Sequence, residues 1–341
     1  MSDAVPSPQA LVAQQAQASS AFDLLHEKVR RWIWLQGWTA LRDIQERSIP
    51  ILLDGTRDLI IGAGTASGKT EAAFLPIVSR LATEERAPGF GFEAIYVSPL
   101  RALINDQFGR IESLCEEIGI PVTKWHGDVA ASVKERARKR PSGIMLTTPE
   151  SLEGILCRRG NEATRLFGGL QYLVVDEMHA FMDSERGRQL QSLLNRIEIA
   201  AGHRVPRVAL SATLADMRIS AAFLRPLDPT NVEILESETA DQALKLQVLG
   251  YTEPAYKPPT GKRSDDEAPP EDVALTKIVR HMFETLRGHR GLIFAGARRY
   301  VELITAELCG LCETLGVPEE LSAHHGSLSR EHREDAERRL K

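Results

Sequence analysis

The sequence predicts an α/β fold in which helices cover both faces of a parallel β-sheet. From Phe22 to about Leu235, short apolar runs with β propensity alternate with longer amphipathic runs of helical periodicity. A loop of small residues, Ala63–Thr70, directly follows the first apolar run, and an acidic pair, Asp176-Glu177, directly follows a later one. Strands that are apolar throughout and separated by helices are typical of a parallel sheet buried on both faces.

Six strands are expected in this region, and most are separated by a helical run of about ten or more residues. A helix over Phe22–Leu35 precedes them, and Cys115 falls on the apolar face of a later helix, which indicates a core position. The expected strands are Asp58–Ile61, Ala94–Val97, Ile144–Thr147, Leu173–Val175, Val208–Leu210 and Val232–Leu235.

The domain organisation follows from changes in composition. Residues 1–20 are rich in Ala, Gln and Ser and are expected to form a disordered arm, and residues 21–236 form the first domain. Residues 237–272 are a connecting strand and a flexible linker, because 255–272 is almost entirely Pro, Gly and charged residues, which cannot bury a core. Residues 273–341 are expected to be the N-terminal part of a second domain.

The second region is expected to contain two short strands and three helices. A helix over Val273–Leu286 leads to a strand at Gly291–Phe294, a helix over Arg298–Leu315, another short strand, and a final helix from about Ser329. Two strands bury little surface, so this region is expected to be incomplete as a domain.

The composition excludes several classes of protein. A formal charge of −5 argues against a protein held on nucleic acid by a general excess of lysine, although local phosphate contacts remain compatible with it. No run of 18 apolar residues occurs, so no membrane contact is expected. Cys309 and Cys312 form one CxxC pair within a helical run and lack a second ligand pair, so the chain is expected to be reduced and cytoplasmic.

The loop Ala63–Thr70 is the strongest motif. A strand precedes it and a helix follows it, which is the context of a phosphate-binding loop. Its backbone N–H groups and the helix N-terminus favour an anion, Lys69 would reach the β- and γ-phosphates of ATP, and the Thr70 hydroxyl would bind Mg²⁺. The alternative is a glycine-rich turn that happens to end in GKT, since Ala63 stands where the strict pattern has Gly. The ATP-binding candidates in the loop are Ala63, Gly64, Thr65, Ala66, Ser67, Gly68, Lys69 and Thr70.

The acidic motif Asp176-Glu177-Met178-His179 follows the strand Leu173–Val175. A carboxylate at the carboxyl end of a parallel strand beside the phosphate loop can hold Mg²⁺, which is the role expected for Asp176. Glu177 would orient or deprotonate the attacking water. The alternative is a solvated acidic loop. Together with Lys69, these two residues are the predicted catalytic set.

The order of motifs resembles the DExH-box branch of superfamily 2 helicases, and within it the Lhr-like (large helicase-related) group. This resemblance implies two RecA-like domains, a P-loop ATPase domain and a partial second one, with ATP between them and single-stranded nucleic acid across both. The matching segments are Gly37–Gln45, Ala63–Thr70, Ser98–Leu103 with Asn105–Gln107, Thr147–Glu150, Asp176–His179, Ser211–Thr213, Leu292–Phe294 with Arg298, and His324–Arg330.

The resemblance also implies roles for individual residues. Gln45 would read adenine, with a surface position as the alternative, and Phe22 would either stack on the base or anchor its helix in the core. His179, Ser211 and Thr213 would couple hydrolysis to domain movement; His179 could instead be a satisfied interior histidine. Contacts with nucleic acid would come from Pro99, Arg101, Thr148, Phe294, Arg298, His325 and Gly326, although Thr148 and Ser327–Ser329 would also serve as ordinary helix caps.

The sequence departs from the family in the motifs expected after His324–Arg330, where the helical stretch and the TSxLExGxDxG-type element are absent. The QRxGRxGR-type motif that supplies an arginine to the γ-phosphate does not occur in these 341 residues. We therefore expect an ATP-dependent helicase or translocase core that binds ATP and Mg²⁺ but turns over slowly by itself, completed by a further segment or a second chain. The alternatives are an ATP-gated nucleic-acid clamp without motor activity and an ATPase that does not bind nucleic acid. The partner is DNA or RNA, single-stranded or with a single-stranded tail.

Overall fold

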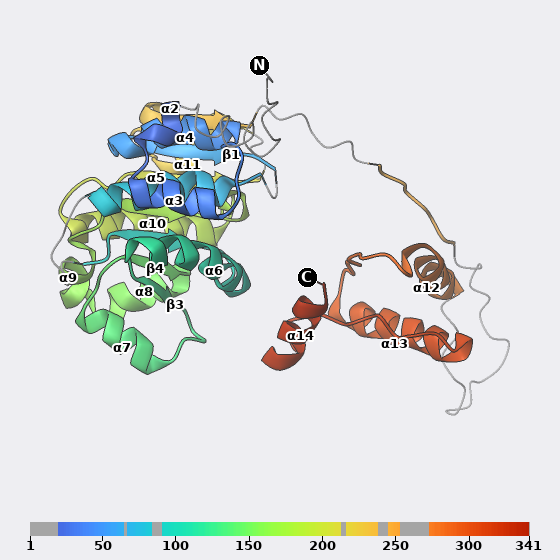
Figure 1. Ribbon diagram of the computed structural model, residues 1–341. Coiled ribbons are helices and arrows are strands. Elements are labelled where there is room, and N and C mark those ends of the chain that lie inside the picture. Colours follow the sequence, from blue (N-terminus) through green and yellow to red (C-terminus); the bar gives the residue numbers. More distant parts are fainter. Residues whose placement is uncertain are drawn as a thin grey trace, which may run out of the picture. The chain divides into compact units, whose positions relative to one another are not determined.

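The computed structural model describes residues 20–64, 67–83, 91–212, 216–237, 245–252 and 273–340. The chain divides into two compact units, Met1–Ala240 and Asp241–Lys341. Figure 1 shows the helices and strands of each unit. Within the described ranges no helix is long and apolar enough to cross a membrane.

The first unit is built on a seven-stranded sheet in which every pairing is parallel. The strand order is β3-β4-β2-β5-β6-β1-β7. All six predicted strands are present, which confirms the α/β fold with a parallel sheet. The strands are β1 (Asp58–Gly62), β2 (Ala94–Val97), β3 (Val122–Trp125), β4 (Ile144–Thr147), β5 (Tyr172–Val175), β6 (Arg207–Ser211) and β7 (Val232–Glu236).

Strand β3 is the strand that the sequence did not predict. Its residues, Val-Thr-Lys-Trp, alternate apolar and polar side chains, and three of the four are only half-buried. It lies at the edge of the sheet and pairs with β4 alone. An edge strand need not be apolar along its whole length, so it lacks the continuous apolar run by which the inner strands are recognised.

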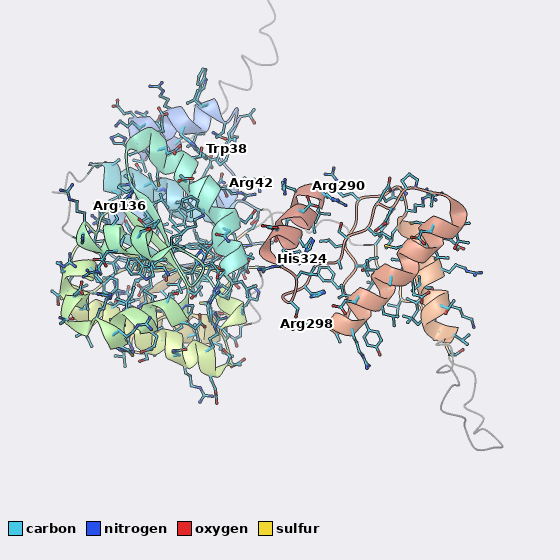
Figure 2. The ribbon with its side chains drawn as sticks, turned by 90° about the horizontal axis from the view of Figure 1, so that it is seen from below. Trp38, Arg42, Arg136, Arg290, Arg298 and His324 are labelled. Carbon is cyan, nitrogen blue, oxygen red and sulfur yellow. The ribbon has the colours of Figure 1, made fainter. Side chains whose placement is uncertain are left out.

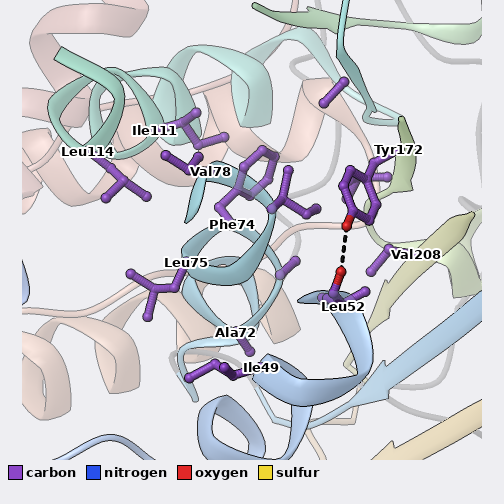
Figure 3. Packing of buried hydrophobic residues seen from close by; sticks show 14 of the residues in the cluster. Ile49, Leu52, Ala72, Phe74, Leu75, Val78, Ile111, Leu114, Tyr172 and Val208 are labelled. Carbon is purple, nitrogen blue, oxygen red and sulfur yellow. Dashed lines mark hydrogen bonds between the residues drawn. The ribbon is translucent and has the colours of Figure 1, made fainter. Parts of the chain in front are cut away.

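Helices cover both faces of the sheet, and each face has its own hydrophobic core. The first core lies between the sheet and α2 to α6, and Figure 3 shows part of it, with Phe74, Val78, Ile111 and Leu114 packed together. Cys115 belongs to this core, as predicted, and Phe22 packs against it. The second core lies under α8 to α11. The helices are α2 (Ser20–Leu24), α3 (Glu27–Leu35), α4 (Asp43–Asp54), α5 (Lys69–Thr83), α6 (Arg101–Ile118), α7 (Ala131–Lys139), α8 (Pro149–Arg158), α9 (Ala163–Phe167), α10 (Glu185–Ala201) and α11 (Met217–Leu224).

The predicted single helix over Phe22–Leu35 is wrong, because α2 and α3 are separate. His26 lies between them in an extended conformation (φ −56°, ψ 143°), and its side chain accepts a hydrogen bond from the Lys28 backbone N–H. This cap starts a new helix at Glu27. The apolar periodicity continues across the break, so the sequence pattern did not reveal it.

A buried ion network holds the amino-terminal edge of the sheet. The carboxylate of Asp58, the first residue of β1, is fully buried and accepts hydrogen bonds from the Arg225 and Arg204 side chains and from the Arg207 backbone. Glu198 of α10 pairs with the Arg207 and Arg225 guanidinium groups. Each buried charge therefore has an opposite charge and hydrogen bonds, as burial requires.

The second unit contains α12 (Val273–Leu286), α13 (Arg298–Leu315) and α14 (Arg330–Leu340). Its small core is formed by Val279, Ile304 and Leu308 together with their partly buried neighbours. The predicted strand Gly291–Phe294 is wrong, and the described residues of this unit contain no strand. A strand needs a neighbour for its ladder hydrogen bonds; here the segment is unpaired, and Leu292 and Phe294 are exposed.

Candidate functional site

In the part of the first unit that the structure describes, the predicted site residues that follow strands lie at the carboxyl edge of the sheet. Ala63 follows β1, Asp176 follows β5 and Ser211 ends β6; these three strands are consecutive in the sheet. Pro99 follows β2 and Thr148 follows β4, in the other half of the same edge. The connections that leave β2 and β5, the strands on either side of the boundary, run in opposite directions along the sheet. Open α/β sheets bind ligands at such a point.

Lys69 lies at the centre of the first half. It is the first residue of α5, is 9% exposed, and its ammonium donates to the carbonyl oxygens of Ala63 at 2.6 Å and Gly64 at 2.8 Å. Burial lowers the pKa of Lys69, while the carboxylates of Glu177 and Asp176 raise it. The lysine is thus held at the start of α5 close to two acids. Thr65 and Ala66 of the predicted loop lie outside the described residues.

Gln45 and Gly68 are in close contact. The Gln45 side chain is 2% exposed; its Oε1 accepts from the Arg42 backbone N–H at 2.9 Å, and its Nε2 lies 3.5 Å from the Gly68 carbonyl. Gly68 has a φ of +86°, and a β-carbon there would come within 2.6 Å of Gln45 Nε2. The positive φ favours glycine, and any larger residue would also have to displace the Gln45 amide. The interpretation of Gln45 as a surface residue is therefore wrong. The hydroxyl of Ser67 is buried without a hydrogen-bond partner in the part of the loop that the structure describes.

Asp176 is 6% exposed, and its carboxylate accepts a hydrogen bond from the buried hydroxyl of Tyr96 on the neighbouring strand β2. Burial raises the pKa of Asp176 to about 6, the Tyr96 hydrogen bond opposes this rise, and the charge of Glu177 adds to it. Burial also raises the pKa of Tyr96 well above its usual value. The tyrosine is therefore a fixed hydrogen-bond donor to the acid.

Glu177 has a left-handed backbone conformation, with a φ of 47°, which is uncommon for a residue other than glycine. Strained conformations of this kind are concentrated at functional sites. Glu177 Oε2 lies 3.4 Å from Nδ1 of His179, and the same nitrogen lies 3.3 Å from Oγ of Ser211 at the end of β6. His179 is partly exposed, so it is not an interior histidine. Thr213 lies outside the described residues.

The donor atoms of this half fit a magnesium ion. Mg²⁺ in proteins is bound by one or two carboxylates and usually shares its remaining positions with water and substrate phosphates. Asp176 supplies one buried carboxylate, and Thr70, the second residue of α5, supplies a hydroxyl beside Lys69. These are the oxygen ligands that a magnesium-bound triphosphate needs from a protein.

A groove of about 1000 Å³ occupies the other half of the edge. Arg101, the first residue of α6, lies at one end, and its Nη1 forms an ion pair of 2.9 Å with Asp128 Oδ1. A β-carbon on Gly127 would come within 2.8 Å of the Arg101 guanidinium, so this glycine leaves the space in which the arginine lies. Both members of the ion pair are about half-exposed, and a ligand phosphate could replace the aspartate.

Thr148 precedes α8, with Pro149 in the first helical position, as the sequence predicts. Its hydroxyl makes no capping bond to the helix backbone and instead lies 3.2 Å from Oγ of Ser151. Pro149 has no N–H, and the N–H groups of Ser151 and Leu152 donate to the Thr148 carbonyl, so the hydroxyls of Thr148 and Ser151 are the groups that could donate to an anion here. Arg186 of α10 fixes this region, because it binds the Glu150 carboxylate at 2.6 Å and the Pro99 carbonyl at 2.7 Å.

In the second unit, Arg298 at the start of α13 donates to Oγ of Ser327 at 2.7 Å, and Gly326 lies beside it. His325 Nε2 lies 3.2 Å from Glu302 Oε1. Phe294 is 89% exposed. Figure 2 shows Arg298 and His324 among the side chains of this unit. The structure therefore brings Arg298, Gly326 and the neighbouring His325 together, while Ser329 accepts a bond from the His332 backbone N–H and acts as a helix cap.

Four residues at these sites were not predicted from the sequence: Tyr96, Asp128, Arg186 and His126, which lines the groove. Tyr96 looked like an ordinary core residue of an apolar strand, and only the pairing of β2 with β5 shows that it faces Asp176. His126 and Asp128 follow β3, the strand that was not predicted. Recognition of that strand would have placed both residues at the same edge.

A parallel sheet with a lysine-bearing loop after its first strand and a buried acid at the same edge defines the RecA-like class of nucleotide-binding domain. The model of the family described as DEAD/DEAH box helicase matches residues 42–220, just over half of the chain. The chain belongs to this family, and its fold and helicase-type core follow from that membership.

The similarity to individual helicases agrees with this family assignment. The ATP-dependent helicase Lhr-Core of Methanocaldococcus jannaschii is 29% identical over 336 residues, which cover 94% of this chain and 37% of that protein. The Lhr helicase of Mycolicibacterium smegmatis, a probable uracil glycosylase, is 28% identical over 84% of this chain and 21% of its own length. The chain thus spans little more than a third of the relatives' length, or less.

Solved structures show the same likeness. The structure of the Mycobacterium smegmatis helicase Lhr bound to ssDNA and AMP-PNP matches with a TM-score of 0.73 and 26% identity, over 93% of this chain and 40% of that one. The DEAD-box helicase Mss116 bound to ssRNA and UDP-BeF matches with a TM-score of 0.72 at 15% identity, over 95% of this chain and 63% of that one, which supports the fold alone.

Proposed function

We propose that this chain is the ATP-hydrolysing core of a nucleic-acid helicase or translocase, in which hydrolysis drives movement along a strand. One observation carries the proposal. The Lys69 cradle with its two acids and the groove beside Arg101 and Thr148 lie at one edge of one sheet. A change at the nucleotide can therefore reach the groove through the strand ends themselves.

In the nucleotide half, Lys69 exchanges its two carbonyl partners for the β- and γ-phosphate oxygens of ATP. The N–H groups at the start of α5 bind the same phosphates. Asp176 and Thr70 hold Mg²⁺, which neutralises the phosphate charge when it is bound. Glu177 orients the attacking water and accepts its proton. Gln45, held against Gly68 at the mouth of the loop, binds adenine through its amide.

His179 links ATP hydrolysis to movement of the second unit. Its Nδ1 lies between the Glu177 carboxylate, at 3.4 Å, and the Ser211 hydroxyl, at 3.3 Å. Departure of the γ-phosphate changes the charge beside Glu177, and this change passes through His179 to the end of β6. Together with Thr213, these residues couple hydrolysis to movement of the second unit.

Pro99, Arg101 and Thr148 bind the phosphates of a single DNA or RNA strand, and the second unit contributes Phe294, Arg298, His325 and Gly326. The relative whose structure holds ssDNA supports this assignment. Contacts with phosphate carry no preference for deoxyribose or ribose.

Calorimetry and an ATPase assay test the proposal. The chain should bind ATP in a magnesium-dependent manner, and Lys69→Ala should weaken this binding at least tenfold, because hydrogen bonds to a charged group contribute about 1.5–3 kcal/mol each. Lys28→Ala removes an exposed lysine of α3 and serves as the matched control. Single-stranded nucleic acid should bind more tightly when the non-hydrolysable analogue AMP-PNP is present. Absence of magnesium-dependent ATP binding by folded protein would refute the proposal, and binding without any hydrolysis in the presence of nucleic acid would favour a clamp.

A further inference from the structure

The groove extends well beyond Arg101 and Thr148, along α7 and α8. Its lining contains five basic side chains and two acidic ones. The basic residues are Arg101, Lys134, Arg138, Arg158 and Arg159, and the acidic residues are Glu135 and Glu150. An excess of positive charge in a concave surface favours a polyanion.

Three of the five cations already have acidic partners. Arg101 pairs with Asp128, Arg138 pairs with Glu135 and Glu162, and Arg159 pairs with Glu162. The side chains of Lys134 and Arg158 form no hydrogen bond or ion pair with any residue that the structure describes. These two cations can therefore accept a new anion without giving up an existing contact.

Arg158 would contact a different phosphate from the one proposed at Thr148. It is the last residue of the ten-residue helix α8, which begins at Pro149. With a rise of 1.5 Å per residue, the two ends of this helix are about 13 Å apart. The Arg158 guanidinium folds back over Gly154, where a β-carbon would come within 2.7 Å of its Nη2. The small residue leaves the arginine room on the groove side of the helix.

His126 forms part of the groove wall near these cations and is unpaired. It is 3% exposed, and both of its ring nitrogens are buried without a hydrogen-bond partner in the described structure. The closest acid, Asp128, lies 3.9 Å from Nδ1, which is too far for a hydrogen bond. Buried polar atoms normally have a partner. Both ring nitrogens of this imidazole therefore lack a hydrogen-bond partner among the described residues, on the wall of a basic groove.

We propose that the groove between α7 and α8 is a second phosphate subsite, distinct from the one at Arg101 and Thr148. Lys134 and Arg158 bind phosphodiester groups of a single strand further along its path, and His126 hydrogen-bonds to that strand. The subsite rests on the proposed function, since it extends the same strand. It sets the length of strand that the first unit can hold.

The test measures the salt dependence of binding. A labelled oligothymidylate and the matching oligouridylate are titrated with the chain, in the presence of Mg²⁺ and AMP-PNP, at several salt concentrations. Each phosphate contact with a single strand contributes about 0.7 to the slope of log affinity against log salt. The double variant Lys134→Ala/Arg158→Ala should therefore lower that slope by about 1.4 for a long oligonucleotide. For an oligonucleotide too short to span α8, the double variant should have the same affinity as the unaltered chain.

The control variant Arg31→Ala/Arg57→Ala also removes two cations, but from exposed surface ion pairs outside the groove, and its slope should not change. His126→Ala should weaken binding while keeping the slope, because burial lowers the pKa of His126 and so disfavours its charged form. An unchanged slope in the groove variant, with Arg101→Ala still lowering it, would overturn the second subsite and leave the proposed function intact. Absence of any binding by the unaltered chain would overturn both.

Discussion

The Tyr96 hydroxyl donates a hydrogen bond to the carboxylate of Asp176 from the neighbouring strand of the sheet. Both groups are buried, so the pKa of Asp176 depends on two opposing effects, burial and the hydrogen bond. Burial raises it to about 6, and the Tyr96 bond limits the rise because it stabilises the charged form. The acid proposed to hold Mg²⁺ thus titrates within an accessible pH range.

Magnesium-dependent ATP binding is expected to weaken as the pH falls through about 6. Only the ionised carboxylate of Asp176 binds the metal, and protonation removes it, so affinity should drop by up to tenfold per pH unit below the midpoint. The pKa is above the usual value of about 3.9 for Asp. The ligand-free fold therefore binds more protons than the unfolded chain between about pH 4 and 6, and this group's contribution to stability decreases as the pH rises through that range.

Tyr96→Phe is expected to move the midpoint of ATP binding to higher pH. The substitution removes the hydrogen bond that lowers the pKa of Asp176 and keeps the buried ring. Calorimetric titrations with Mg²⁺-ATP between pH 5 and 8 measure the shift, and Tyr300→Phe, on the surface of the second unit, is the control. A midpoint that stays in place or moves to lower pH would contradict the assignment of Asp176 as the titrating ligand.

Glu177→Gln is expected to retain ATP binding and to lose hydrolysis. A glutamine keeps the size of the side chain but cannot accept the proton of the attacking water, and general base catalysis contributes about 10²–10⁴-fold. The readout is the ratio of bound ATP to released phosphate in a single-turnover experiment with nucleic acid present. Glu185→Gln changes an exposed acid at the start of α10 and should leave both quantities unaltered. Equal hydrolysis by Glu177→Gln and the unaltered chain would exclude Glu177 as the base.

Asp128→Asn is expected to increase the affinity for a single strand. The aspartate occupies the Arg101 guanidinium at 2.9 Å, and phosphate has to displace it. Because exposed ion pairs contribute about 0–1 kcal/mol, the gain should be at most about fivefold. Fluorescence anisotropy with a labelled oligonucleotide measures it, and Asp43→Asn, which removes an exposed acid of α4 outside the groove, is the control. Weaker binding by Asp128→Asn would show that the ion pair positions Arg101 and does not compete with phosphate.

The inner strands and the nucleotide loop were predictable from the sequence because each has a local signature. The strands of the sheet centre contain continuous apolar runs, and two of them are followed directly by the loop that carries Lys69 and by the acid Asp176. Parallel strands bring their carboxyl ends to one edge, so residues distant in the chain could be placed together by topology alone.

Other features were not predictable because they depend on partners far away in the sequence. The hydrogen bond between Tyr96 and Asp176 exists only once β2 and β5 are neighbours. Strand β3 has a mixed pattern because it lies at an edge, and the residues that follow it, His126 and Asp128, were missed with it. Conversely, Gly291–Phe294 has a strand-like sequence, but it remains unpaired.

Asp58→Asn is expected to destabilise the first unit by about 3–5 kcal/mol, because it removes one partner of a buried charge network and leaves Arg225 and Arg204 without that carboxylate. Urea denaturation followed by tryptophan fluorescence measures the loss. Glu233→Gln breaks the exposed ion pair with Arg57 nearby and should cost less than about 1 kcal/mol. Since Asp58 begins β1 and the Lys69 loop follows its other end, ATP affinity of the folded fraction should stay unchanged. A loss below 1 kcal/mol would mean that Glu198 alone satisfies Arg225, and that the network contributes little to holding the amino edge of the sheet.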